Sequence, residues 1–309
     1  MHGSSQLSLG NAGSIAALPA ATGGSGALIG TDNPNGVLPM ATPIPATNPG
    51  SCNQDVDIVF SLDVSGSMGP PLTKLDNEVM LVDAALATKN LPSPPHYGLV
   101  IFVDDVMVMN NGMAYPTLDA LRMELANQIS MTSANSARQV DPNGPPNFSW
   151  PENSLDSLYA AATQYQWRPD ATTLRTVIHI TDASFWDKMV VSSGAMSEAP
   201  GPMDMGSMHG YAETVAALRA AKIWVNTFTA MTGGPPDGMM SPPSHGQFRG
   251  TSVDVGKGFD EPYAGMPSIP MATGGFSWDI DDVYDGKISL ATPINMSIEA
   301  HQCAVYPLN

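Results

Sequence analysis

Residues 56–69 read VDIVFSLDVSGSMG, and this stretch decides the fold class. The apolar run at 56–62 predicts a strand buried on both faces, as in a parallel sheet. Asp63, Ser65 and Ser67 follow at alternating positions, so three oxygen-bearing side chains stand at the carboxyl end of the strand. In open α/β sheets, ligands bind beyond this edge. The stretch therefore predicts a site at the end of the first strand.

Strand and helix patterns alternate along the rest of the chain. Buried runs predict strands at 96–103, 175–184 and 222–230, with a short second strand before residue 112 and a final one within 274–281. Helical periodicity marks 72–90, 117–129, 151–166 and 209–221, and a weak C-terminal helix lies within 284–303, where Pro293 interrupts or offsets it. This order predicts a doubly wound α/β domain, whose mainly parallel central sheet carries helices on both faces.

Composition and hydrophobic periodicity indicate where the domain begins and ends. Residues 1–50 are rich in Gly, Ala, Ser, Asn, Pro and Thr and show no period, so we expect a flexible leader or linker. The domain is expected at 51–304 and a short tail at 305–309. Residues 231–272 contain many Gly and Pro, which predicts an elaborated surface loop.

The net negative charge of the chain disfavours anionic partners. The chain has 12 Lys and Arg against 29 Asp and Glu, a formal charge of −17. Such a surface repels phosphate backbones and anionic lipids, so we expect neither a nucleic-acid partner nor direct membrane insertion. No apolar run approaches the roughly 20 residues that span a bilayer. A cation is a more plausible partner, although acidity also serves solubility alone.

Two more acids stand where they can join the first site. Asp182 lies at the carboxyl end of the strand within 175–184, and Glu152 follows Pro151 at the start of the helix within 151–166. A small hard dication prefers oxygen ligands and keeps some water. Each residue also has a structural explanation, because Ser65 and Ser67 can satisfy a turn and Glu152 can interact with the helix dipole.

The D-x-S-x-S run after a buried strand resembles the metal-ion-dependent adhesion site of the von Willebrand factor A family. In element order, the resemblance extends over about residues 52–303. Within that family, the motifs SWPENSLDSL, VIHITDASF and FVDD look most like the integrin β I-like domain. The resemblance implies a Rossmann-like fold and a Mg²⁺ or Mn²⁺ ion held, directly or through water, by Asp63, Ser65, Ser67, Glu152 and Asp182.

The same resemblance implies a neighbouring ion, Ca²⁺, with a second set of ligands. The matching positions are Asp104, Asn147, Ser149, Pro151 and Glu152. Ser149 departs from the family pattern, because it supplies a hydroxyl where the family has a carboxylate, and lower ligand charge predicts weaker Ca²⁺ binding. A third site of that subfamily needs acids where this chain has Pro70 and Pro71, so we expect it to be missing.

These residues suggest a non-enzymatic module that binds a partner's carboxylate at the open position of a divalent metal, in adhesion or another protein interaction. One alternative is a structural or assembly module whose metal only rigidifies the loops. Another is a metal-assisted hydrolase. His179 is the one candidate for its base, but a lone histidine on a strand is more often a packed core residue. Zinc is not expected, because no second His or Cys stands at ligand spacing.

The only two cysteines, Cys52 and Cys303, bracket the patterned sequence. Domain termini tend to lie close together, which favours a disulfide over two unrelated thiols. A disulfide implies an oxidising compartment, and together with the family resemblance it predicts an extracellular or cell-surface protein. In related A domains, sliding of the C-terminal helix changes affinity. A Cys52–Cys303 bridge is expected to restrict such sliding.

Overall fold

The chain is described here by a computed structural model, which covers residues 53–144, 146–147, 151–188, 208–231 and 256–307. The predicted leader at 1–50, Cys52, Ser149 and most of the predicted loop at 231–272 lie outside these ranges, as do residues 189–207. Among the residues covered, no helix combines the length and hydrophobicity that crossing a membrane requires.

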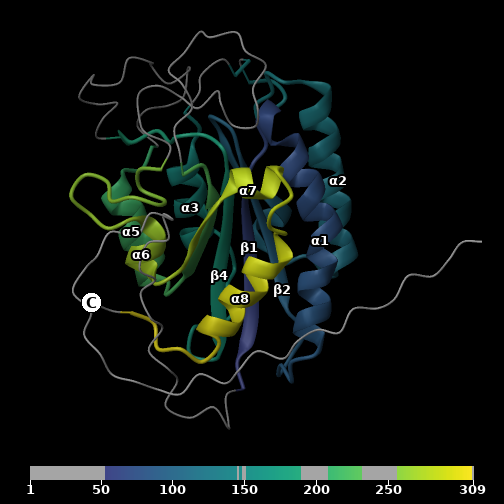
Figure 1. Cartoon of the computed structure of the whole chain (residues 1–309), viewed down its shortest axis with the longest axis vertical. Coiled ribbons are helices and arrows are strands. Elements are labelled where there is room, and N and C mark those ends of the chain that lie inside the picture. Colours follow the sequence, from purple (N-terminus) through teal and green to yellow (C-terminus); the bar gives the residue numbers. More distant parts are fainter. Residues whose placement is uncertain (1–52, 145, 148–150, 189–207, 232–255, 308–309) are drawn as a thin grey trace, which may run out of the picture. The chain divides into compact units, whose positions relative to one another are not determined.

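In the described part of the chain, six strands form one sheet in the order β3-β2-β1-β4-β5-β6 (Figure 1). Only β3 runs antiparallel to its neighbour; the other pairings are parallel. The predicted mainly parallel sheet is confirmed. The strands are β1 (Asp55–Asp63), β2 (His96–Phe102), β3 (Val106–Val108), β4 (Thr173–Thr181), β5 (Trp224–Thr229) and β6 (Ser277–Asp279).

Helices cover both faces of this sheet, as the alternating pattern predicts. One face carries α1 (Gly69–Ala87), α2 (Leu118–Ala134), α7 (Ile280–Tyr284) and α8 (Ala291–His301). The other carries α3 (Ser154–Thr163), α5 (Tyr211–Ala220) and α6 (Ile269–Thr273). Two short 3-10 turns, η1 (Gly66–Met68) and η2 (Met109–Gly112), precede α1 and follow β3.

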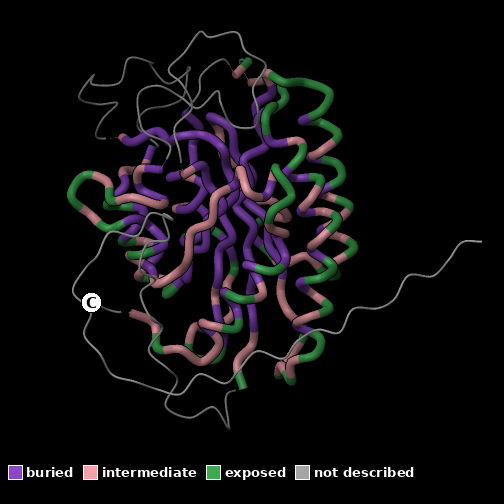
Figure 2. The backbone as a smooth tube through the Cα atoms, in the orientation of Figure 1, coloured by how far each residue is buried: buried purple, intermediate pink, exposed green. Residues whose placement is uncertain are grey.

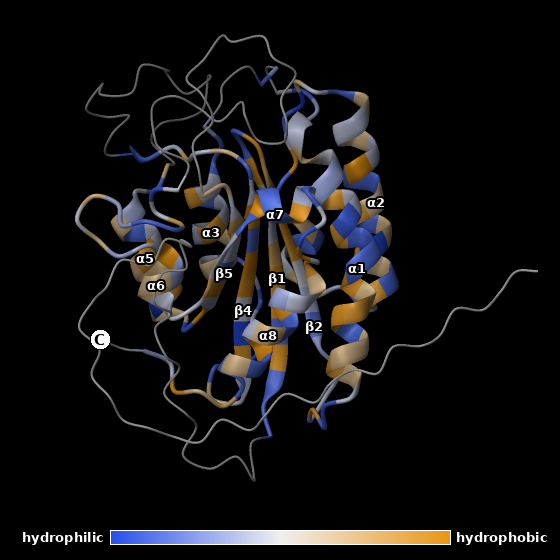
Figure 3. Ribbon diagram, in the orientation of Figure 1, coloured by the Kyte–Doolittle hydropathy of each residue, from blue (hydrophilic) through white to orange (hydrophobic). Residues whose placement is uncertain are grey.

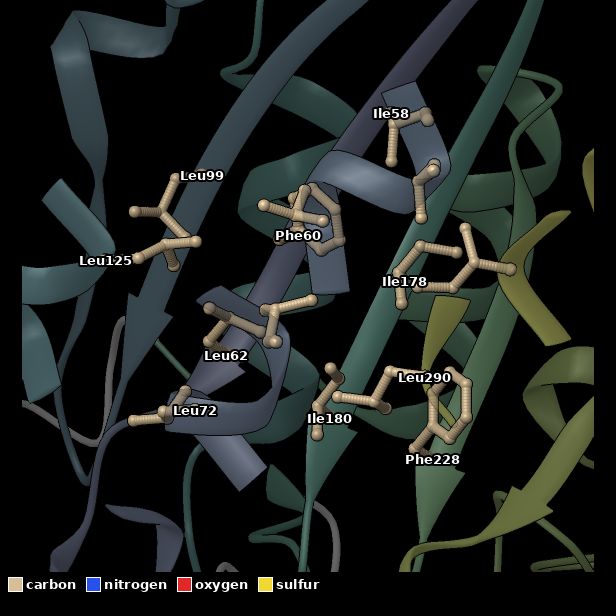
Figure 4. Close-up of a cluster of buried hydrophobic side chains, with 14 of the residues drawn as sticks. Ile58, Phe60, Leu62, Leu72, Leu99, Leu125, Ile178, Ile180, Phe228 and Leu290 are labelled. Carbon is tan, nitrogen blue, oxygen red and sulfur yellow. The ribbon is translucent and has the colours of Figure 1, made fainter. Parts of the chain in front are cut away.

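Alternation along β1 divides its side chains between two cores. Ile58, Phe60 and Leu62 pack with residues of α1, α2 and α8 (Figure 4). Val59 points to the opposite face and packs with α3 and α5. The strands are buried along most of their length, whereas the outer sides of the helices are exposed (Figure 2), and the apolar residues concentrate on the strands (Figure 3). Asp63 has the parity of Val59, so its side chain belongs to the α3 face.

The structure corrects the expected start of the third helix. Pro151 and Glu152 do not open α3, which begins at Ser154 with Asn153 as its N-cap residue. The backbone before the helix makes other hydrogen bonds instead: Glu152 N–H donates to the Ser184 carbonyl at 2.8 Å, and Asn153 N–H donates to the Val103 carbonyl at 2.7 Å. Glu152 is therefore fixed between two loops at the edge of the sheet.

Two other local expectations need correction. Pro293 does not interrupt the C-terminal helix, because α8 begins at Ala291 and a proline in the first turn removes an N–H that has no intrahelical partner. The described part of the stretch at 231–272 is more than a surface loop. It contains all but the last residue of α6, and Phe259 and Ile269 are fully buried in the core beneath α3 and α5.

The C-terminal end of the domain lies beside its first described residues. Cys303 N–H donates to the Gln54 side-chain carbonyl at 3.0 Å, only two residues along the chain from Cys52. Cys303 is not a free cysteine. Because Cys52 is outside the described residues, its pairing with Cys303 stays a prediction.

Candidate metal centre

The centre forms where β1 and β4, neighbours in the sheet, end at the same edge. Asp63 is the last residue of β1, and Asp182 directly follows β4. Both oxygens of Asp63 accept hydrogen bonds: Oδ1 from Ser65 N–H at 2.8 Å and Oδ2 from the Thr181 hydroxyl at 2.7 Å. The Asp63 carboxylate is fully buried and held in one orientation.

The two serines lie between the ends of the two strands. The Ser67 hydroxyl donates to Asp182 Oδ1 at 2.9 Å, and the Ser65 and Ser67 hydroxyl oxygens are 3.4 Å apart. The turn needs glycine at position 66, since a Cβ there would lie 2.7 Å from the Ser136 carbonyl oxygen. The fold therefore brings Asp63, Ser65, Ser67 and Asp182 to one place, as their positions at the strand ends predict.

Glu152 enters the same region from the loop before α3. Its Oε1 accepts a hydrogen bond from the Asn147 side-chain amide at 3.0 Å. Its Oε2 is buried and has no hydrogen-bond partner among the described residues. A buried carboxylate oxygen without a partner is costly unless it is protonated or binds a cation.

The buried acids of the centre raise one another's pKa values. Burial, and then the charge on Asp182, raises the pKa of Asp63 from 3.8 to about 7. Burial, with the charges on Asp63 and Asp104, raises the pKa of Glu152 well above its usual value. Buried like charges oppose each other's ionisation, and a bound dication would reverse this effect.

The donor set fits a hard divalent cation. Carboxylate and hydroxyl oxygens are the ligands that Mg²⁺ prefers, in a shell usually completed by water. Within the ranges that the structure covers, no three His, Cys, Asp or Glu side chains gather closely enough to hold a metal by themselves. A metal here would need the hydroxyls of Ser65 and Ser67, and water, in addition to the acids.

Some of the residues predicted to form a second site lie close to Glu152. Asp104 follows β2 and is buried, and its charge contributes to the raised pKa of Glu152. Asn147 contacts Glu152 directly, and Pro151 is buried beside it. Gln139 holds Asp104 through two hydrogen bonds: its side-chain amide donates to Oδ2, and its carbonyl accepts from Asp104 N–H at 3.1 Å. Ser149 lies outside the described residues.

His179 is a packed core residue, as expected. It is fully buried, its Nδ1 is 2.9 Å from the Ser61 hydroxyl, and its ring stacks on Phe102. Burial lowers the pKa of His179 to about 3. An imidazole with this pKa is a poor general base at neutral pH, which weakens the hydrolase alternative.

Some side chains that contact the proposed ligands were not among the predicted site residues. Thr181 donates to Asp63, Gln139 holds Asp104, and the Tyr284 hydroxyl lies 3.3 Å from Asp182 Oδ2. Thr181 was within reach of sequence reasoning, because it has the same parity as other strand-end residues on that face. Gln139 and Tyr284 carry no local signal.

Comparison with known proteins identifies no family for this chain. No protein-family model matches the sequence, and no curated protein matches it. Solved structures similar to it include an aerotolerance-related membrane protein from Bacteroides fragilis with multiple mutations to serines (15% identity, 79% of this chain and 98% of that chain covered, TM-score 0.42). Another is the conserved hypothetical protein BatB from Bacteroides thetaiotaomicron (14% identity, 79% and 99% covered, TM-score 0.39).

A third similar structure is proximal thread matrix protein 1 from the mussel byssus (12% identity, TM-score 0.40). The match covers 83% of this chain and 48% of the mussel protein. Another structure of that mussel protein is described with a zinc-occupied MIDAS motif (15% identity, 59% and 39% covered, TM-score 0.34). Similarity at these identities and TM-scores does not identify a function.

Proposed function

We propose that this protein is a divalent-metal-dependent binding module, which holds Mg²⁺ or Mn²⁺ at Asp63, Ser65, Ser67, Glu152 and Asp182 and binds a carboxylate of a partner. The observation that carries the proposal is Glu152 Oε2, a buried carboxylate oxygen with no hydrogen-bond partner among the described residues, on a side chain that interacts electrostatically with Asp63 and Asp182. The resemblance of the D-x-S-x-S run to a metal-ion-dependent adhesion site supports the same assignment.

Each residue has a distinct part in this proposal. Asp63 is fixed at both oxygens and supplies negative charge at the base of the site. Ser65 and Ser67 supply neutral oxygens, so the shell carries less negative charge than one built of carboxylates alone and opposes an anionic partner less. Glu152 and Asp182 complete the shell directly or through water. When bound, the metal would provide the positive charge and the open coordination position for the partner's carboxylate.

The proposed setting is extracellular or at the cell surface, and the proposed role is adhesion or another protein interaction and not catalysis. The family resemblance and the predicted cysteine pair support this setting. A structural module whose metal only rigidifies the loops is the alternative that needs a direct test, since the same acids serve either role.

Partner capture tests the proposed function. Immobilised protein loaded with Mg²⁺ is expected to retain a partner from the native surface or matrix, and a chelator should release it. Soluble acidic peptides should compete, whereas the same peptides with Gln and Asn in place of Glu and Asp should not. Capture that is unchanged by the chelator and by the acidic peptides would contradict metal-dependent carboxylate binding. Metal-dependent turnover of esters or phosphoesters would instead favour a hydrolase.

Metal affinity is expected to fall as the pH falls below 7. Because the Asp63 carboxyl has a pKa of about 7 in the metal-free protein, it is mostly protonated at pH 5.5 and must lose its proton to bind a cation. We expect roughly twentyfold weaker Mg²⁺ or Mn²⁺ binding at pH 5.5 than at pH 7.5, from titration of this one group.

Calorimetry at the two pH values measures this change, and buffers of different ionisation enthalpy report the proton released. Burial holds the pKa values of His179 and His301 at about 3 and about 4, so neither side chain changes charge in this range. Circular dichroism at pH 5.5 provides the control for an intact fold. Equal affinities at pH 5.5 and 7.5 would show that no ligand of the ion, Asp63 included, takes up a proton in this range.

We also propose a weaker Ca²⁺ site at Asp104, Asn147, Ser149, Pro151 and Glu152. Its weakness is ascribed to Ser149, so Ser149→Asp is expected to tighten Ca²⁺ binding, because affinity follows the charge of the ligands. Competition between Ca²⁺ and Mn²⁺ during titration separates the two sites. Unchanged Ca²⁺ affinity in the variant would mean that position 149 is not a ligand.

A further inference from the structure

Tyr284, the last residue of α7, reaches the candidate metal centre from the far end of the sequence. Its hydroxyl donates to the Ser67 main-chain carbonyl at 2.9 Å and lies 3.3 Å from Asp182 Oδ2. Ser67 belongs to the turn after β1, and Asp182 belongs to the loop after β4. One phenolic group therefore contacts both of the strand ends that form the centre.

The position of Tyr284 is fixed from α1, the helix that follows the metal turn. Lys74 of α1 donates from Nζ to the Val283 carbonyl at 3.0 Å and to the Ile288 carbonyl at 2.9 Å. Val283 is buried in the core that α1 and α7 share. The backbone on both sides of Tyr284 is thus tied to the helix that begins beside Ser67.

These contacts restrain Asp182 at both of its oxygens. Oδ1 accepts the hydrogen bond from the Ser67 hydroxyl, and Oδ2 faces the Tyr284 hydroxyl. Partners of this kind orient the ligands of a metal, and losing one typically costs about 10–100-fold in metal affinity. The ring of Tyr284 packs against the core, so the hydroxyl can be removed without removing that packing.

We propose that Tyr284 is a positioning residue of the metal centre, whose hydroxyl holds Ser67 and Asp182 in the arrangement that accepts the ion. This inference rests on the proposed metal site and extends it to α7. Tyr284 itself contributes no metal ligand. Through this hydroxyl, the positions of Ser67 and Asp182 depend on the position of α7.

Titration of Tyr284→Phe with Mn²⁺ alone tests the proposal. We expect about tenfold weaker binding than in the wild type, at the low end of the range for such partners, with an unchanged melting temperature for the metal-free protein. The matched control is Tyr306→Phe. Tyr306 also donates its hydroxyl to a backbone carbonyl, that of Ile223 at 3.0 Å. Ile223 directly precedes β5, so this contact lies at the end of the sheet opposite the metal centre. This control should bind Mn²⁺ as the wild type does.

The electron paramagnetic resonance spectrum of bound Mn²⁺ is a second readout, because it responds to ligand geometry and not to global stability. At saturation, the spectrum of Tyr284→Phe should differ from those of the wild type and Tyr306→Phe. Equal affinity and an identical spectrum for Tyr284→Phe would overturn the positioning role and leave the metal site intact. Equal losses in both variants would indicate a general structural effect and would also overturn it. A wild type that binds no Mn²⁺ would instead refute the metal site itself.

Discussion

Substituting Asp63 with alanine is expected to weaken Mg²⁺ and Mn²⁺ binding by at least about 100-fold, since loss of an outer partner alone costs about 10–100-fold. Asp63 is the only acid of the centre placed within the D-x-S-x-S turn, and both of its oxygens are oriented by hydrogen bonds. Calorimetric titration of the wild type and the variant measures the difference. Asp119→Ala is the control, because Asp119 is an exposed acid in the first turn of α2. Equal heats for the wild type and Asp63→Ala would refute the site.

In the metal-free protein, replacing Asp63 with the near-isosteric asparagine should stabilise the fold. The folded-state pKa of Asp63 is raised to about 7 from 3.8, so ionising it disfavours the folded state as the pH rises from about 4 to 7. Asp63→Asn removes this penalty. Relative to the wild type, the metal-free variant should therefore gain stability between pH 4 and pH 7, while losing the stabilisation that added metal gives the wild type. Denaturant unfolding at both pH values, with and without Mg²⁺, measures both effects.

Arg168→Ala is expected to destabilise the fold by about 3–5 kcal/mol, because it removes the partner of a buried charge. Asp57 lies near the start of β1, at the opposite end from Asp63, and is fully buried. Arg168 donates to both of its oxygens, from Nε at 2.6 Å and from the main-chain N–H at 2.9 Å, and donates from Nη2 to the Val56 carbonyl at 2.7 Å. The main-chain bond can persist in the variant, but the Asp57 carboxylate loses its cation.

Thermal and denaturant unfolding measure this loss, which corresponds to roughly 10 °C in melting temperature for a domain of this size. Lys222→Ala is the matched control. Lys222 forms an ion pair with Asp170 at 2.6 Å, but both side chains are exposed to solvent, so the loss should stay within about 1 kcal/mol. Asp57→Asn in the Arg168→Ala background should recover part of the stability. Equal effects of the two single variants would show that Asp57 tolerates burial without its partner.

The centre could be anticipated because it depends on two simple rules. Parallel strands align their carboxyl ends, and side chains alternate along each strand. Asp63 and Asp182 follow from the first rule once the apolar runs are recognised as strands. Glu152 was identified by a motif, and its expected place at a helix start was wrong. Backbone hydrogen bonds to Ser184 and Val103, which no local pattern indicates, hold it in the loop before α3.

Two short helices and one buried loop residue could not be predicted from the sequence. The helices α6 and α7 have 5 residues each, too few for a helical period to show in the sequence. Phe259 is buried within a stretch whose Gly and Pro content predicts a surface loop, because α6 and the loop that carries Phe259 cover part of the sheet. Burial of this kind depends on the neighbours and not on the composition of the segment.

By itself, the sequence determined the doubly wound α/β class and which acids and hydroxyls stand at the strand ends, because the hydrophobic periods of strands and helices are local signals. Only the tertiary structure decided how those groups are held and charged. The Thr181 hydroxyl on Asp63, the Gln139 amide on Asp104 and the Tyr284 hydroxyl beside Asp182 are contacts between elements. The raised pKa values of Asp63 and Glu152 likewise arise from burial and mutual proximity, which exist only after the strands and loops have packed together.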